Sequence, residues 1–263
     1  MRAFRLSFAA LLCGVAAAAS AHDTWFRPLE SPVGVRLLAL GTGNRYPVHE
    51  TGVGAPYLAR QGCAQGGQAS AMEALRNDPR ALVLRADSRA HSCWAQLVPL
   101  DVELAPAKVA VYLNEIQAPA QVRQAWADMQ ARGLAWREQY TKHARIDFDR
   151  FDGPVPMAMD IVRESASDGQ YRFRAWRDGA PLPGLALELI SESATRGIWR
   201  RTDTEGRIRL PALPAGRWVL RGTDLRLSAA DPERWESHFV TLAFEVPGVS
   251  AAVAGMGLTA GGH

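Results

Sequence analysis

The sequence predicts a mainly β protein built from two β-sandwich-like domains with a short helical insertion. Three observations carry this prediction. Short apolar or alternating segments recur between turns rich in glycine and proline, which is typical of strands. One region repeats its apolar residues at helical spacing. The second half holds five or six short strands separated by tight turns at regular intervals, as a β-sandwich does.

The first 21 residues have the three-part layout of a secretory signal peptide. Arg2 and Arg5 precede the apolar run LSFAALLCGVAAAA, and Ala19-Ser20-Ala21 follows as a small-residue cleavage site. A buried N-terminal helix is the alternative. The run is short for a bilayer span, and no later segment is apolar enough to cross a membrane. We therefore expect a periplasmic chain that begins at His22.

Charge and cysteine content narrow the classes of function. Removing Arg2 and Arg5 lowers the formal net charge from +3 to +1. Because no basic run with interleaved aromatic residues remains, nucleic acid is not an expected partner. The mature chain keeps two cysteines, Cys63 and Cys93. In an exported protein such a pair predicts a disulfide, with two buried free thiols as the alternative.

The first domain is expected over residues 22–150. Strands are predicted at GVRLLAL (34–40), ALVLRA (81–86) and SCWAQLVPLDVEL (92–104). The segment GTGNRYPVHETGVGAP (41–56) predicts a loop. Residues 61–80 are polar, and we expect irregular structure there.

A helical segment is expected over about 119–145. Val122, Trp126 and Met129 are spaced by four and three residues, as on one face of a helix. After Gly133, the residues Trp136, Tyr140 and His143 repeat that spacing. This pattern predicts a helical hairpin or a broken helix packed against the first domain.

The second domain is expected over residues 151–250, after the boundary segment DFDRFDGPVP, and residues 251–263 are expected to be a flexible tail. Strands are predicted at the following segments: QYRFRAW (170–176), LALELIS (185–191), GIWRRTD (197–203), RIRLPAL (207–213), RWVLRGTDL (217–225) and HFVTLAFEV (238–246). Alternation of Ile208 with Leu210 and of Trp218 with Leu220 gives each strand one buried face.

Two stretches of the second domain, DGAPLPGLALEL and TDTEGRIRLPALPAGRWVLR, resemble the small prealbumin-like or carboxypeptidase-regulatory-like sandwich. The wider layout combines AHDTWF after the signal peptide, WREQYTKHARI in mid-chain and RWESHFVTLAFEV at the end. Together these segments resemble the DUF4198 family, the NikK-like periplasmic component associated with nickel and cobalt uptake. The resemblance implies a metal-handling protein whose partner is an uptake transporter in the inner membrane.

A metal site is predicted around the mature N-terminus. A chain that starts at His22 offers a metal the α-amine and the ring Nδ1, and such nitrogen ligands suit copper, nickel or cobalt. The arrangement resembles the histidine brace of copper proteins. Asp23 could add a carboxylate ligand or orient the imidazole. His49, in the glycine-rich loop, and His143, on the expected helix, are the candidate further ligands.

The remaining histidines are weaker candidates for metal ligands, and other functions are less favoured by the sequence. His238, at the start of the last strand, is expected at the surface. No G-x-S-x-G motif is present and the cysteines are expected to be paired, so we expect no enzyme. Two alternatives stay open. One is an interaction module without metal that binds another envelope protein. The other, a copper oxidase of the brace type, needs a second histidine beside His22.

Overall fold

In the computed structural model, which describes residues 22–148, 153–164 and 170–248, the chain is mainly β, with 53% strand and 11% helix, and sandwich-like. The sequence prediction of the fold class is confirmed. The predicted signal peptide 1–21, the tail 251–263 and the domain boundary near residue 150 lie outside the described residues. In that described part of the chain, no helix has the length and apolar character needed to cross a membrane.

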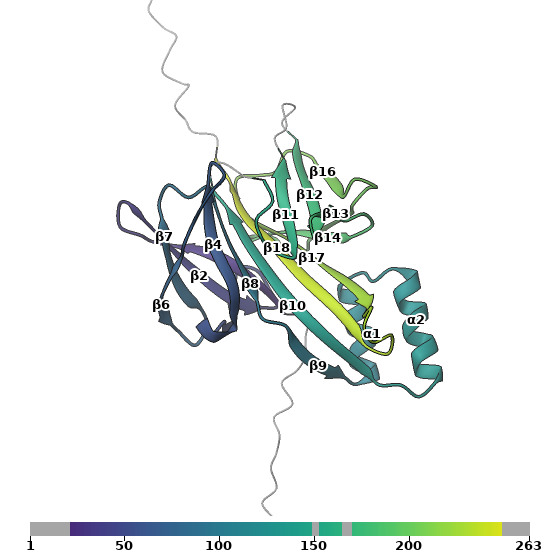
Figure 1. Ribbon diagram of the computed structural model, residues 1–263. Coiled ribbons are helices and arrows are strands. Elements are labelled where there is room, and N and C mark those ends of the chain that lie inside the picture. Colours follow the sequence, from purple (N-terminus) through teal and green to yellow (C-terminus); the bar gives the residue numbers. More distant parts are fainter. Residues whose placement is uncertain (1–21, 149–152, 165–169, 249–263) are drawn as a thin grey trace, which may run out of the picture.

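Three sheets organise the molecule (Figure 1). The five-stranded sheet has the order β1-β2-β7-β6, with β3 beside β2. Its strands are β1 (Asp23–Leu29), β2 (Val35–Gly43), β3 (Thr51–Gly52), β6 (Glu73–Asn77) and β7 (Leu82–Asp87).

The nine-stranded sheet has the order β15-β14-β17-β18-β10-β8-β4-β5, with β9 beside β10. Its strands are β4 (Leu58–Gln65), β5 (Gln68–Ser70), β8 (Ser92–Leu97), β9 (Leu100–Leu104), β10 (Trp136–Asp147), β14 (Ala186–Ser191), β15 (Ile198–Arg201), β17 (Gly216–Leu227) and β18 (Trp235–Val246). Because β10 pairs in parallel with β18, this sheet joins the two halves of the chain.

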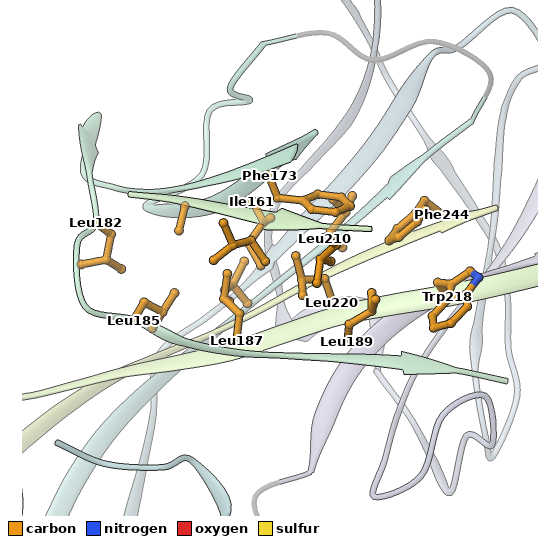
Figure 2. Packing of buried hydrophobic residues seen from close by; sticks show 14 of the residues in the cluster. Ile161, Phe173, Leu182, Leu185, Leu187, Leu189, Leu210, Trp218, Leu220 and Phe244 are labelled. Atoms are coloured by element: carbon orange, nitrogen blue, oxygen red, sulfur yellow. The ribbon is translucent and has the colours of Figure 1, made fainter. Parts of the chain in front are cut away.

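The four-stranded sheet has the order β11-β12-β13, with β16 beside β12. Its strands are β11 (Met159–Glu164), β12 (Tyr171–Arg177), β13 (Ala180–Pro181) and β16 (Arg207–Leu210). Its apolar side packs on the nine-stranded sheet (Figure 2). In that core, Ile161 and Phe173 meet Leu187, Leu220 and Phe244.

A second core lies on the other side of the nine-stranded sheet. Phe26 and Leu84 of the five-stranded sheet pack with Ile146 of β10 and with both cysteines. Cys63 and Cys93 are opposite each other in the pairing of β4 with β8, and they form the predicted disulfide. The central sheet is therefore covered on both faces, which explains why β18 is buried along almost its whole length.

Two helices pack against one end of the long strands β10, β17 and β18 (Figure 1). They are α1 (Pro106–Glu115) and α2 (Ala120–Ala131), and a short 3₁₀ helix, η1, covers Ala55–Tyr57. Val122, Trp126 and Met129 are buried on one face of α2, as predicted. The helix α1 was not expected, although Pro106 at its first turn and the spacing of Val109 and Leu113 are helical signals.

The predicted second helical stretch is wrong, because residues 136–147 form the strand β10. Hydrogen bonding on both sides, to β18 and to β8 and β9, makes it a central strand. Side chains alternate along a strand, so Trp136 and Tyr140 share a face and His143 lies on the other. The prediction was wrong because the spacing of four and three residues placed side chains from two faces of a strand on one face of a helix.

The prediction of irregular structure over 61–80 is also wrong. This stretch contains most of β4 and the whole of β5 and β6. Both β5 and β6 are exposed along their length, so their side chains carry no alternation of apolar and polar residues. Without a buried face, a strand gives little periodic signal in the sequence.

Candidate functional site

The site is built around His22, which immediately precedes β1. Its ring Nε2 lies 3.0 Å from Oε2 of Glu50, and its main-chain carbonyl accepts a hydrogen bond of 2.7 Å from Nζ of Lys142. The histidine side chain keeps 26% of its surface exposed. His22 is therefore held on two sides and still reaches solvent.

The loop after β2 carries Glu50 to this position. β1 pairs with β2 so that Asp23 faces Gly43, and the main-chain N–H of Glu50 donates to the carbonyl of Thr42 at 2.8 Å. A Cβ atom on Gly43 would lie 2.3 Å from the carbonyl oxygen of Val48. The tight return of the loop thus requires glycine at this position, and it places Glu50 beside the first residue of the predicted mature chain.

Asp23, the first residue of β1, connects this strand to β17. Its carboxylate accepts a hydrogen bond of 2.6 Å from Nη1 of Arg221, and Arg221 also pairs with Glu188. Burial raises the pKa of Asp23, and the neighbouring Arg221 opposes that shift. The structure therefore places this candidate ligand in an ion pair that fixes the start of β1.

His49 packs against β1. Its ring packs on Trp25 with 5.4 Å between centroids, and its Nε2 lies 3.2 Å from the Trp25 carbonyl. A Cβ on Gly41 would come within 2.4 Å of the His49 ring, so this ring fills space that a glycine leaves. Burial lowers the pKa of His49 to about 4, which keeps the imidazole neutral at pH 7.

His143 belongs to a histidine pair on the far side of β10 from Lys142. It is 1% exposed, and its ring stacks on His238 with 5.1 Å between centroids and 14° between planes. Its Nδ1 lies 3.0 Å from the Phe239 carbonyl. Burial lowers the pKa of His143 to about 3 and that of His238 to about 4. The expected surface position of His238 is wrong, since it is 7% exposed.

The four predicted ligands are therefore not brought together. Across residues 22–148, 153–164 and 170–248, no three histidine, cysteine, aspartate or glutamate side chains form a group that could hold a metal ion. The sequence analysis proposed His22 but not its neighbours Glu50 and Lys142. Glu50 follows His49 in the same loop, and a loop has no alternation from which the directions of the two side chains could be predicted.

A pocket of about 500 Å³ opens beside His22. It lies between β2 and β3 on one side and β9, β10 and α1 on the other, and most of its wall is apolar. Lys142, Tyr140 and Glu138 enter it from the same face of β10. Removal from water lowers the pKa of Lys142 to about 8, while the Asp23 carboxylate opposes that shift.

Glu138 at the floor of this pocket is fully engaged. Tyr112 donates to Oε1 at 3.0 Å, Trp136 Nε1 donates to Oε2 at 2.8 Å, and the Ser237 hydroxyl donates to Oε1. Burial raises the pKa of Glu138, and these three donors oppose the rise. The carboxyl group therefore links α1 to β10 and β18.

Comparison with known proteins assigns no family. No family model matches the chain, and no curated protein matches it. Among solved structures, one similar chain is native alpha-2-macroglobulin from Escherichia coli, spanning domains MG0-NIE-MG1. The match has 9% identity and a TM-score of 0.21, and covers 74% of this chain and 91% of that one.

Proposed function

We propose that this protein is exported to the bacterial periplasm, is cleaved before His22, and binds nickel, cobalt or copper without catalysing a reaction. The α-amine and the imidazole Nδ1 of His22 hold the ion. The protein passes it to an uptake transporter in the inner membrane. This follows the resemblance to the periplasmic nickel and cobalt uptake component.

The observation that carries the proposal is the way in which His22 is held. A chelate with the terminal amine uses Nδ1, and the nitrogen bonded to Glu50 is Nε2. A carboxylate on the second ring nitrogen fixes the tautomer and orientation of a metal-bound histidine and raises its basicity. Lys142 holds the carbonyl of the same residue. A terminus held in this way loses less conformational entropy on binding an ion than a frayed one.

The donor set is suited to an ion that must leave again. Two nitrogen donors on one residue fill part of a coordination sphere, and the other positions are left to water or to the receiving protein. His49 and His143 keep structural contacts on other faces. The proposed site therefore favours transient delivery over permanent storage.

Competition titration with a metallochromic chelator tests the proposal. The chain from His22 onward is compared with His22→Ala, with an N-terminally acetylated form and with Glu50→Ala. We expect the first two changes to abolish tight binding of copper and nickel. Loss of the Glu50 carboxylate should weaken binding by about 10-fold, the lower end for a group behind a ligand.

His91→Ala is the matched control, because it removes a histidine beside the disulfide-bonded strands and should leave affinity unchanged. Affinity should also fall as the pH is lowered, since protons compete for the amine and the imidazole. Equal affinity in the acetylated and free-amine forms would contradict the proposed chelate.

A further inference from the structure

The pocket beside His22 holds one lysine among apolar walls. Tyr57, Leu100, Val102, Tyr140 and Phe239 supply much of its apolar surface. The Lys142 Nζ lies 5.5 Å from the centroid of the Tyr140 ring and 6.0 Å from that of Phe239. The volume of the pocket, about 500 Å³, lies within the range of roughly 300–1,000 Å³ that is usual for small-molecule sites.

Lys142 forms no ion pair with any carboxylate that the structure describes. Glu138, on the same face of β10, accepts three hydrogen bonds from other side chains. Asp23, the carboxylate that contributes to the pKa of Lys142, is paired with Arg221 at 2.6 Å. The ammonium group donates to the neutral carbonyl of His22. A half-buried cation in this setting is stabilised by an anion that enters the pocket.

The other charges of the pocket restrict the anion. Asp101 and Glu138 also line it. Asp101 pairs with Arg234 and Glu138 accepts three hydrogen bonds, and a wall that carries these acidic groups disfavours a ligand with several negative charges. The aromatic and aliphatic walls favour a flat apolar body, because burial of apolar surface supplies most of the binding free energy of such sites.

We propose that this pocket binds a small organic molecule with a flat apolar body and one anionic group, and that Lys142 receives the anion while the rings of Tyr140 and Phe239 contact the body. This inference goes beyond metal binding and requires no metal ion.

Two dyes with the same aromatic body provide the probe. The first, 1-anilinonaphthalene-8-sulfonate, carries one sulfonate, and N-phenyl-1-naphthylamine lacks it. Fluorescence titration is run with EDTA present, so that its outcome is separate from that of metal binding. We expect saturable binding of one molecule per chain, with the sulfonate dye at least 10-fold tighter than the neutral dye.

Variants locate the site. Lys142→Met should remove the preference for the sulfonate dye and leave the affinity for the neutral dye within 2-fold. Lys108→Met is the matched control, because it replaces the chain's other lysine on the exposed side of α1 and should change neither affinity. Leu100→Trp fills the pocket and should weaken both dyes at least 10-fold. His22→Ala should keep the preference even though it abolishes the proposed metal site.

The comparison of the two dyes on the unaltered protein guards against a variant that fails to fold, because the preference for the sulfonate dye is measured there without any substitution. Equal behaviour of the two dyes, or an equal loss of preference in Lys108→Met, would overturn the proposal.

Discussion

The stacked pair His143 and His238 should make the stability of this protein depend on pH in a way that can be calculated. Both rings are removed from water and both are neutral in the folded chain, because burial lowers their pKa values from 6.5 to about 3 and about 4. Arg177 and the neighbouring ring oppose a positive charge at His143. Protons therefore bind preferentially to the unfolded chain, in which the imidazoles are in water.

The sign and size of the effect follow from linkage. A lowered folded-state pKa gives stability that is complete above about pH 6.5 and is lost as the pH falls toward 4. Between pH 7.5 and 5, protonation of one unfolded-state imidazole lowers the free energy of unfolding by about 2 kcal/mol. The two histidines together contribute about 4 kcal/mol. At pH 5 this figure depends mainly on the unfolded-state pKa, since both folded-state values lie below 5.

The assay is urea denaturation at pH 5 and at 7.5, followed by tryptophan fluorescence. The quantity compared is the difference in unfolding free energy between the two pH values. It should be about 2 kcal/mol smaller in His143→Gln and in His238→Gln, and about 4 kcal/mol smaller in the double variant. Val240→Ala is the control, because Val240 pairs with His143 in the sheet. It should lower stability equally at both pH values.

The outcome that would refute the reasoning is a double variant that keeps the pH dependence of the unaltered protein to within about 1 kcal/mol. The two imidazoles would then titrate in the folded chain as they do in water, and the interpretation of His143 and His238 as a buried, neutral pair would be wrong.

Three further perturbations test other parts of the structure. Reducing the Cys63–Cys93 disulfide, whose partners are 30 residues apart, should lower the free energy of unfolding by about 3–4 kcal/mol; chemical denaturation of the oxidised and reduced forms should show it, and a loss below about 1 kcal/mol would contradict it. Gly41→Ala places a Cβ 2.4 Å from the His49 ring and should cost about 1–3 kcal/mol in thermal denaturation, whereas Gly153→Ala, with no atom within 4 Å of its Cβ, should change little. Burial raises the pKa of Asp147 to about 6, so its contribution to stability is present at low pH and lost as the pH rises from about 4 to 6; Asp147→Asn should flatten that part of the curve, and an unchanged slope would argue against a buried carboxyl group.

The strands of the second half could be predicted because each combines a local turn with a one-sided apolar pattern. Ile208 and Leu210 of β16 show this, since both face the core. The strand β10 could not be predicted in the same way. Over its second half both faces are buried: Ile146 packs in the core shared with the five-stranded sheet, and Arg145 on the other face bonds Asp160 of β11. Where neither face meets water, the alternation of apolar and polar residues disappears from the sequence.

Of the candidate site, only His22 could be predicted from the sequence. His22 could be proposed from its position after a predicted cleavage site, a property of the sequence alone. Glu50 and Lys142 reach it from a loop and from a strand that is 120 residues away, and such contacts depend on the pairing of distant strands. His49 and His143 were plausible ligands by residue type, but His49 packs on Trp25 and alternation along β10 directs His143 away from Lys142.

The account's central claim is that His22, at the start of the mature chain, binds a transition metal ion. The most direct measurement is a native mass spectrum of the protein purified from the periplasm of its host, before and after copper, nickel and cobalt are offered. We predict a chain that begins at His22, lacks two hydrogens because of the disulfide, and carries one metal ion that His22→Ala loses. A chain that begins at His22 and stays metal-free with all three ions would contradict the claim.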